Sequence, residues 1–209
     1  MQPLVMHGRV ECPPAALLLD CIQEMGARRS NPVLELLRDM PAFVQGDKYP
    51  QAALSFGDDD WRSYYHSHPV ANADVREHGH FHLFARKGNG WTHLAALAMD
   101  LEGQPLRWVI TNRWVTGSDW RDRNSLLASI NALVPSEEPD VLRQWLVSLL
   151  KLYRTELGDL LEARDARITG LLQGRSIDKV LDDRTLYELV CSPIDLTAKL
   201  TSELTGESS

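Results

Sequence analysis

Residues 77–99, EHGHFHLFARKGNGWTHLAALAM, contain the pattern that decides the fold. Aromatic and aliphatic residues stand on both sides of Gly88-Asn89-Gly90, which predicts two strands joined by a tight turn. The same composition continues outward in both directions, and Asp100–Gln104 marks a further turn. The sequence therefore predicts an antiparallel β-meander. Its expected strands are Trp61–His68, His78–Arg86, Trp91–Met99 and Pro105–Thr116.

Apolar residues at helical spacing predict helices on both sides of this sheet. Pro13-Pro14 precedes good helix formers, and Asn31-Pro32 begins a second helical pattern that stops before Pro41. Residues 45–60 are rich in Gly, Pro and Asp, which predicts a loop. A long helix is expected from Ser136 to Leu172, with Gly174 as its terminator. Other predicted helices span 13–26, 121–133 and 182–190, and Glu162, Arg164, Asp165 and Arg167 form an expected solvated face.

Together these patterns predict one α+β domain over residues 1–209, with a meander of three to five strands flanked by N-terminal helices and a long C-terminal helix. The expected parts are N-terminal helices in 1–44, a histidine-rich antiparallel sheet in 61–116, C-terminal helices in 136–190, and a partly flexible tail in 191–209.

Charge and cysteine usage limit the class of partner. The net charge is −7, so no overall positive field favours nucleic acid. Cys12, Cys21 and Cys191 form no CxxC pair, which predicts reduced thiols. The N-terminus lacks a signal-peptide pattern, and no apolar run approaches the roughly 18 residues of a membrane span. We expect a cytoplasmic protein without membrane partners.

Six of the seven histidines fall within residues 66–93. Side chains two apart in a strand share a face about 6.6 Å apart, which lets two imidazoles converge on one metal ion. His78 and His82 would lie about 13 Å apart, so His80 and His82 are the expected pair. Gly79 leaves His78 to turn away or to donate an outer hydrogen bond.

Hairpin parity extends this face to the neighbouring strands. A two-residue turn at Gly88-Asn89 or Asn89-Gly90 places His93 beside His80 and His82. A three-residue loop within Asp100–Gln104 adds Arg107, Val109, Thr111 and Arg113. The opposite, apolar face is expected to hold Phe81, Leu83, Leu94, Ala96, Ala98, Leu106, Trp108, Ile110 and Trp114. A bulge in any strand would reverse part of this assignment.

The leading hypothesis is a metal-binding protein, extended to a metal-dependent enzyme that acts on a small anionic substrate. His80, His82 and His93 are the expected ligands, with His66 or His68 completing the site. A site of imidazoles with a carboxylate such as Glu77 or Asp74 suits a divalent transition metal: zinc, iron, manganese or nickel. Glu77 is the candidate base, and Arg107, Thr111 and Arg113 are the candidate substrate-binding residues.

Two alternatives remain open. In the first, the imidazoles and arginines form a metal-free small-molecule module that binds a carboxylate or phosphate. In the second, the helix Leu142–Leu171 mediates interaction with a partner or a homodimer. Asp58-Asp59-Asp60 is interpreted as a turn, with hard-cation binding as its alternative. Asp119 is interpreted as a helix cap or as part of the histidine site.

Established motifs for other classes are missing from the sequence. It contains no Walker loop, Gly-x-Gly-x-x-Gly, Gly-x-Ser-x-Gly or His-Glu-x-x-His motif, and Glu77 lies too far from His66-Ser67-His68 for a cupin metal motif. Three stretches, EHGHFHLF at 77–84, WTHL at 91–94 and ITNRWVTG at 110–117, resemble the bacterial family named domain of unknown function 6969. The resemblance covers roughly Tyr49 to Trp120 and implies no ligand or catalytic residue.

Overall fold

The computed structural model describes residues 12–40, 42–67 and 76–206 and has at its centre a six-stranded antiparallel sheet. The strands pair in chain order, so each connection joins spatial neighbours. The predicted α+β class is confirmed, while the predicted three to five strands are too few. The strands are β1 (Lys48–Phe56), β2 (Trp61–His66), β3 (Gly79–Lys87), β4 (Gly90–Met99), β5 (Pro105–Thr111) and β6 (Glu188–Pro193).

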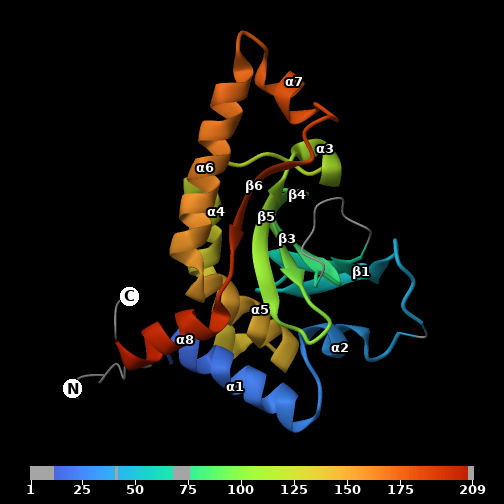
Figure 1. Ribbon diagram of the computed structural model, residues 1–209, viewed down its shortest axis with the longest axis vertical. Helices are drawn as coiled ribbons and strands as arrows, with labels where there is room; N and C mark the ends of the chain where they lie inside the picture. Colours follow the sequence, from blue (N-terminus) through green and yellow to red (C-terminus); the bar gives the residue numbers. More distant parts are fainter. Residues whose placement is uncertain (1–11, 41, 68–75, 207–209) are drawn as a thin grey trace, which may run out of the picture.

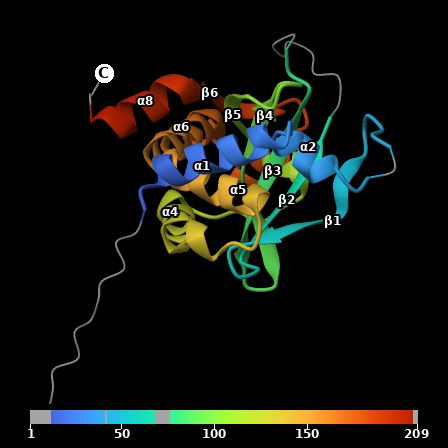
Figure 2. The ribbon, with the colours of Figure 1, turned by 90° about the horizontal axis from the view of Figure 1, so that it is seen from below.

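The longer helices, of ten residues or more, gather along one face of the sheet, as Figures 1 and 2 show. The helices are α1 (Pro14–Ala27), α2 (Pro32–Leu37), α3 (Arg113–Thr116), α4 (Arg123–Ala132), α5 (Val141–Leu152), α6 (Arg154–Leu172), α7 (Ile177–Leu181) and α8 (Leu196–Thr205), with a 3-10 turn η1 (Pro135–Glu137). Among the residues described, no helix combines the length and the apolar character needed to cross a bilayer.

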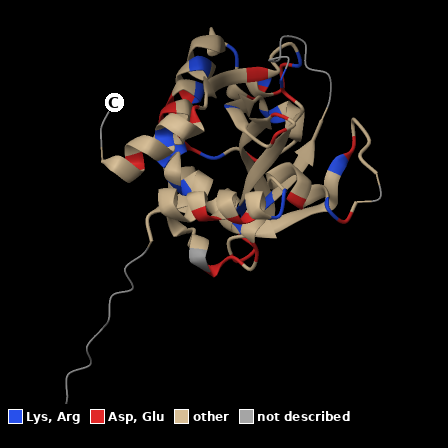
Figure 3. Cartoon of the chain, turned by 60° about the horizontal axis from the view of Figure 1, so that its bottom comes forward, with Lys and Arg blue, Asp and Glu red and all other residues tan. Residues whose placement is uncertain are grey.

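The core lies between the sheet and helices α1, α4, α5 and α6. Phe81 and Leu83 of β3 are fully buried in it, and the Phe81 ring lies 6.2 Å from that of Trp145 in α5. Helix α5 is sandwiched between the sheet and α1, and most of its residues are therefore buried. In the view of Figure 3, Lys and Arg residues lie among Asp and Glu residues on helices and strands alike.

Two bulges determine which side chains occupy each face. Between β3 and β4, Leu83 pairs with Ala95 and Phe84 with His93, so Leu94 is an extra residue. Between β4 and β5, Ala98 pairs with Arg107 and Met99 with Pro105, so Leu106 is extra.

Each bulge shifts by one residue the alternation of side chains between the two faces of the sheet. The first moves Ala96 and Ala98 onto the histidine face, opposite His82 and His80, so their predicted place on the apolar face is wrong. The second reverses the shift, so Arg107, Val109 and Thr111 still face the histidines as predicted.

Strand β1 replaces the loop expected at residues 45–60. Pro50 lies inside it, and proline is tolerated there because β1 is an edge strand that pairs only with β2. Its register is irregular between Tyr49 and Leu54. The composition of residues 45–60 therefore did not indicate β1, which is stabilised by its pairing with β2.

Strand β5 ends at Thr111, five residues before the predicted end. The Asn112 side chain accepts a hydrogen bond from the backbone N–H of Arg113 and begins α3, and Gly117 at φ 61° ends it. Arg113 and Trp114 therefore belong to a helical turn, and their predicted places on the two sheet faces are wrong.

The C-terminal half also differs from the prediction. The long helix is divided at Tyr153, where the buried ring packs 6.1 Å from Trp108, and neither Gly nor Pro marks the break. The helix expected at 182–190 does not form: α7 ends before it at Leu181, residues 182–187 are not helical, and β6 begins at Glu188, where it pairs along β5. The expected tail contains α8, which the Asp195 side chain caps at its N-terminus.

Arg164 is buried rather than part of a solvated face. Its side chain is 1% exposed, and the guanidinium carbon lies 3.9 Å from the centre of the Trp120 ring. It also donates hydrogen bonds to Asp165 and to the carbonyl of Arg121. Burial lowers the pKa of Arg164, while the adjacent Asp165 raises it. The residue thus joins α6 to the segment before α4.

We expect Arg164→Ala to lower the free energy of unfolding by about 3 kcal/mol, because it leaves a cavity and removes the cation from Trp120. Urea unfolding followed by circular dichroism measures this change. Arg167→Ala, at an exposed position on the same helix, should change stability by less than about 0.5 kcal/mol. Equal effects of the two variants would contradict the structural role of Arg164.

Candidate functional site

Cross-strand pairing brings four histidines together on the face opposite the helices. His66 pairs with His80, and Tyr64 pairs with His82. The ring centres lie 4.8 Å apart for His80 and His82, 5.9 Å for His66 and His80, and 6.4 Å for His66 and His82. His93 is 5.1 Å from His82. We call His66, His80, His82 and His93 the histidine cluster.

The deepest part of the cluster is a chain of hydrogen-bonding groups. The Nδ1 atom of His82 lies 3.0 Å from Nε2 of His93, and Nδ1 of His93 lies 3.4 Å from the Thr111 hydroxyl. If Thr111 accepts from His93, then His93 accepts from His82, which leaves the lone pair of His82 on Nε2. His82 and His93 are 4% and 7% exposed, so solvent offers little alternative hydrogen bonding.

His80 is held by a charged network. Its Nδ1 lies 3.3 Å from Oε1 of Glu77, and Oε2 of Glu77 accepts from Arg107 at 3.1 Å. Arg107 also donates to both oxygens of Glu188 on β6. One guanidinium is thus shared by two carboxylates, and the network of Glu77, Arg107 and Glu188 carries a net charge of about −1 when His80 is neutral.

At the outer edge of the cluster, Nδ1 of His66 lies 3.0 Å from the carbonyl oxygen of Asp47. A carbonyl oxygen only accepts, so Nδ1 of His66 carries the proton in this contact. Tyr64 stacks beside His82 at 4.9 Å, and the ammonium group of Lys48 lies 4.7 Å from the Tyr64 ring.

The environment favours uncharged side chains at His82 and His93 and an ionised Glu77. Burial lowers the pKa of His82 well below its usual value, and the other histidines and Lys48 lower it further. Burial, with His80, lowers the pKa of His93 to about 3. Burial by itself would raise the pKa of Glu77, but hydrogen bonds and charges from His80 and Arg107 outweigh it and lower this pKa.

A small cavity of about 20 Å³ adjoins His80 and His82, which is room for roughly one water molecule. Its polar walls come from the charged network and Thr111, and its apolar walls include the two alanines that the first bulge turned to this face. The lining residues are Glu77, His80, His82, Ala96, Ala98, Arg107, Val109, Thr111, Tyr187 and Glu188.

Other candidate residues lie elsewhere. His78 faces the apolar side, where Nδ1 lies 2.8 Å from the Tyr65 hydroxyl. Arg113 forms ion pairs with Asp178 of α7 and with Asp182, the residue after α7, away from the cavity. His68 and Asp74 lie outside the described residues.

Two aspartate interpretations are now resolved. Residues 57–60 form a turn between β1 and β2, as predicted for Asp58-Asp59-Asp60. Asp119 does not cap α4, because Asp122 does so by accepting from the backbone N–H of Ser125. Asp119 instead bridges to Thr92 at the beginning of β4.

In the part of the chain that the structure describes, no three His, Cys, Asp or Glu side chains are arranged to hold one metal ion together. The rings approach one another, but each Nδ1 atom is engaged in a hydrogen-bonding contact. The roles predicted for Glu77, Arg107 and Thr111 remain predictions.

The sequence prediction did not include Tyr64, Tyr187 and Glu188 in the site. Tyr64 had an available signal, because it lies two residues before His66 on a strand and therefore shares its face. Tyr187 and Glu188 had none, since they reach the cavity only through the pairing of β6 with β5.

The fold and this face define an α+β protein with a six-stranded antiparallel sheet and a largely buried histidine cluster on the sheet face opposite the helices. The family model described as domain of unknown function (DUF6969) matches residues 14–194. The chain belongs to this family, as its motifs predicted. No curated protein and no solved structure matches the chain.

We expect acid to destabilise the metal-free protein below about pH 6.5. Unfolded histidines take up protons there, whereas His82 and His93 stay neutral in the folded state because burial lowers each pKa. Their contribution is complete above that pH and is lost as pH falls toward the folded pKa, about 3 for His93. The slope should approach about 3 kcal/mol per pH unit for two protons.

Urea unfolding in chelator at several values between about pH 5 and 7 measures this slope and avoids the range in which Glu77 titrates. His93→Gln should reduce the slope by about half, since one titrating imidazole is removed. The same slope in wild type and variant would show that His93 is charged when folded.

Proposed function

We propose that the histidine cluster binds a divalent transition-metal ion, with His66, His80 and His82 as ligands. The observation that carries the proposal is the contact made by each Nδ1 atom: with the Asp47 carbonyl, with Glu77 and with His93. When Nδ1 carries the proton, the lone pair lies on Nε2. Metal-binding histidines are usually held in this way by an outer acceptor.

Ring spacing supports the same assignment. Zn–N bonds of about 2.0–2.1 Å with tetrahedral angles place the ring centres of two ligands roughly 5 Å apart. The three spacings are 4.8, 5.9 and 6.4 Å. Small shifts of the rings would bring the Nε2 atoms together without moving a strand, while each Nδ1 atom keeps its outer hydrogen-bonding partner.

Charge also favours a cation over an anion at this face. Burial favours the neutral form of His82, which is the form that binds metals. Arg107 is already shared by Glu77 and Glu188, so little positive charge remains for a substrate carboxylate or phosphate. The metal-free anion module therefore has less support than the metal site. Imidazole ligands suit zinc, iron or nickel better than manganese.

We expect tag-free, chelator-treated protein to bind one Zn²⁺ per chain in isothermal titration calorimetry. His66→Ala should weaken binding by about tenfold or more, because one imidazole ligand is lost. His78→Gln is the matched control, since it removes a histidine on the apolar side. Failure to bind Zn²⁺, Ni²⁺ or Fe²⁺ stoichiometrically, or wild-type affinity in His66→Ala, would refute the proposal.

Glu77→Gln should weaken Zn²⁺ binding by about 10–100-fold with unchanged stoichiometry, because an outer carboxylate orients its histidine ligand. Glu188→Gln should have a smaller effect, since Glu188 bonds to Arg107 within the same network. Calorimetry of the two variants makes the comparison, and thermal unfolding verifies that both are folded. Equal losses would mean that the network acts only through its total charge.

A further inference from the structure

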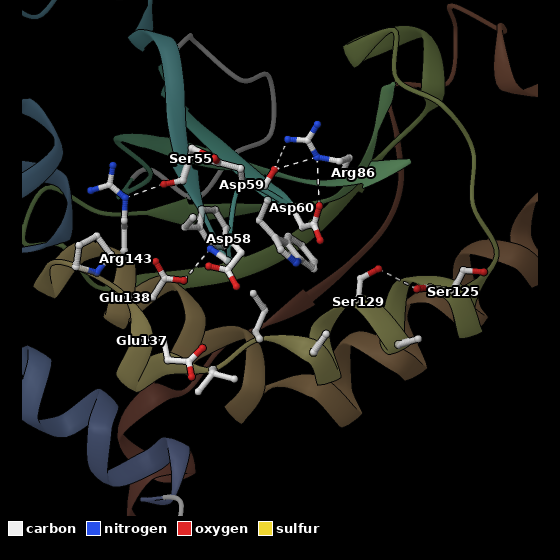
Figure 4. A pocket seen from close by; sticks show the side chains of 18 of the residues that line it. Ser55, Asp58, Asp59, Asp60, Arg86, Ser125, Ser129, Glu137, Glu138 and Arg143 are labelled. Carbon is white, nitrogen blue, oxygen red and sulfur yellow. Dashed lines mark hydrogen bonds and ion pairs between the residues drawn. The ribbon is translucent and has the colours of Figure 1, made fainter. Parts of the chain in front are cut away.

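A second, much larger cavity of about 1190 Å³ lies between the β1–β2 turn and the helical layer. One wall is formed by the turn and by the end of the β3–β4 hairpin, and the other by α4, η1 and the beginning of α5 (Figure 4). Small-molecule sites usually occupy about 300–1,000 Å³, so this cleft can hold an organic ligand. It shares no lining residue with the histidine cluster.

The shape of the turn depends on Gly57. Its φ is 58°, and a Cβ atom there would come within 2.5 Å of Leu133 on the opposite wall. The Gly57 N–H donates to Oε1 of Glu138 at 2.7 Å, which connects the two walls at one end of the cleft. Asp58 and Asp59 follow with φ of 51° and 62°, in the left-handed region that aspartate tolerates better than most residues.

The arginines of the cleft are already engaged. Arg86 donates to the carbonyl of Asp59 and pairs with Asp60. Arg143 pairs with Asp140 and donates to the carbonyl of Ser55. A third, Arg121, donates to the carbonyls of Arg86 and Ser125 and to the hydroxyl of Ser129. Arg86 and Arg143 are therefore ion-paired, and Arg121 directs its N–H donors to neutral groups of the chain, so few donors remain for an anionic ligand.

Four carboxylates of the cleft form no ion pair among the described residues: Asp58, Asp59, Glu137 and Glu138, of which Asp59 accepts from the Ser55 hydroxyl. Glu138 is the most informative, because it is only 9% exposed and a single oxygen accepts a hydrogen bond, from Gly57. Glu138 lines the cleft, and its second oxygen accepts no hydrogen bond from the described residues. In the view of Figure 4 the carboxylate of Asp58 appears near that of Glu138, and the two interact electrostatically.

The electrostatic environment of Glu138 indicates that its carboxylate would be stabilised by a cation. Burial raises the pKa of Glu138 above its usual value, and the negative charges of Asp140 and Asp58 raise it further. The hydrogen bond from Gly57 and the charge of Arg143 lower this pKa, but they do not outweigh the other effects. A cation between Asp58 and Glu138 would relieve this repulsion and donate to the open oxygen. Ala128, Ala132 and Val134 contribute apolar surface to the opposite wall.

We infer that this cleft binds an aliphatic amine, whose ammonium group lies between Glu138 and Asp58 and whose carbon chain lies along Ala132 and Val134. An ammonium ion supplies up to three hydrogen-bond donors, which matches two carboxylates with open oxygens. A hard divalent cation fits less well, because it requires six or more oxygen ligands and Asp60 and Asp140 are held by arginines.

Calorimetric titration with pentane-1,5-diamine tests the inference. Glu138→Gln retains an oxygen for the Gly57 N–H but loses the charge, so it should weaken diamine binding by about tenfold or more. Asp58→Asn should also weaken binding. Glu162→Gln is the matched control, since it removes a carboxylate that is 73% exposed and lies outside the cleft, and its affinity should equal that of wild type.

The uncharged analogue pentane-1,5-diol should not bind, and thermal unfolding verifies that each variant is folded. No diamine binding at millimolar concentration, or equal affinity in wild type and Glu138→Gln, would overturn the inference. Tighter binding of Mg²⁺ or Ca²⁺ that displaces the diamine and depends on Glu138 would also overturn it. These outcomes do not depend on the histidine cluster, so they are independent of the metal-binding proposal.

Discussion

The pairing register of β3 with its neighbours is the constraint on which both faces of the sheet depend. Side chains alternate along β3, so the pairing that buries Phe81 and Leu83 against the helices also directs His80 and His82 to the other face. A slip of one residue would place imidazoles against Trp145 in the apolar core, where their hydrogen bonds would be lost. Core packing therefore positions the histidine cluster.

Burial on the histidine face imposes a second constraint, which is electrostatic. His82 and His93 are removed from water with no carboxylate in direct contact, so they remain neutral and bond to each other and to Thr111. The carboxylate of Glu77 lies farther along the face, where His80 and Arg107 stabilise its charge. Neutral imidazoles therefore lie beside a network with excess negative charge. This arrangement favours the binding of a cation.

The two proposed sites lie at opposite ends of β2 and differ in chemistry. Trp61 lines the cleft and His66 belongs to the cluster, about 17 Å apart along the strand. The cluster is closed, rich in nitrogen donors and adjoins a cavity the size of one water. The cleft is far larger and presents carboxylate oxygens, so the two sites select a transition-metal ion and an organic cation respectively.

The sequence by itself determined the α+β class, the central strands and the convergence of His80, His82 and His93, because alternation and turn residues are local properties of the chain. Arg107 and Thr111 were placed on the correct face only because the bulges at Leu94 and Leu106 cancel, while Ala96 and Ala98 lie between them and were misplaced. Tertiary structure alone decided the edge strands β1 and β6, the break at Tyr153 and the burial of Arg164. Each of these depends on pairing or packing with residues distant in the chain, which no local pattern encodes.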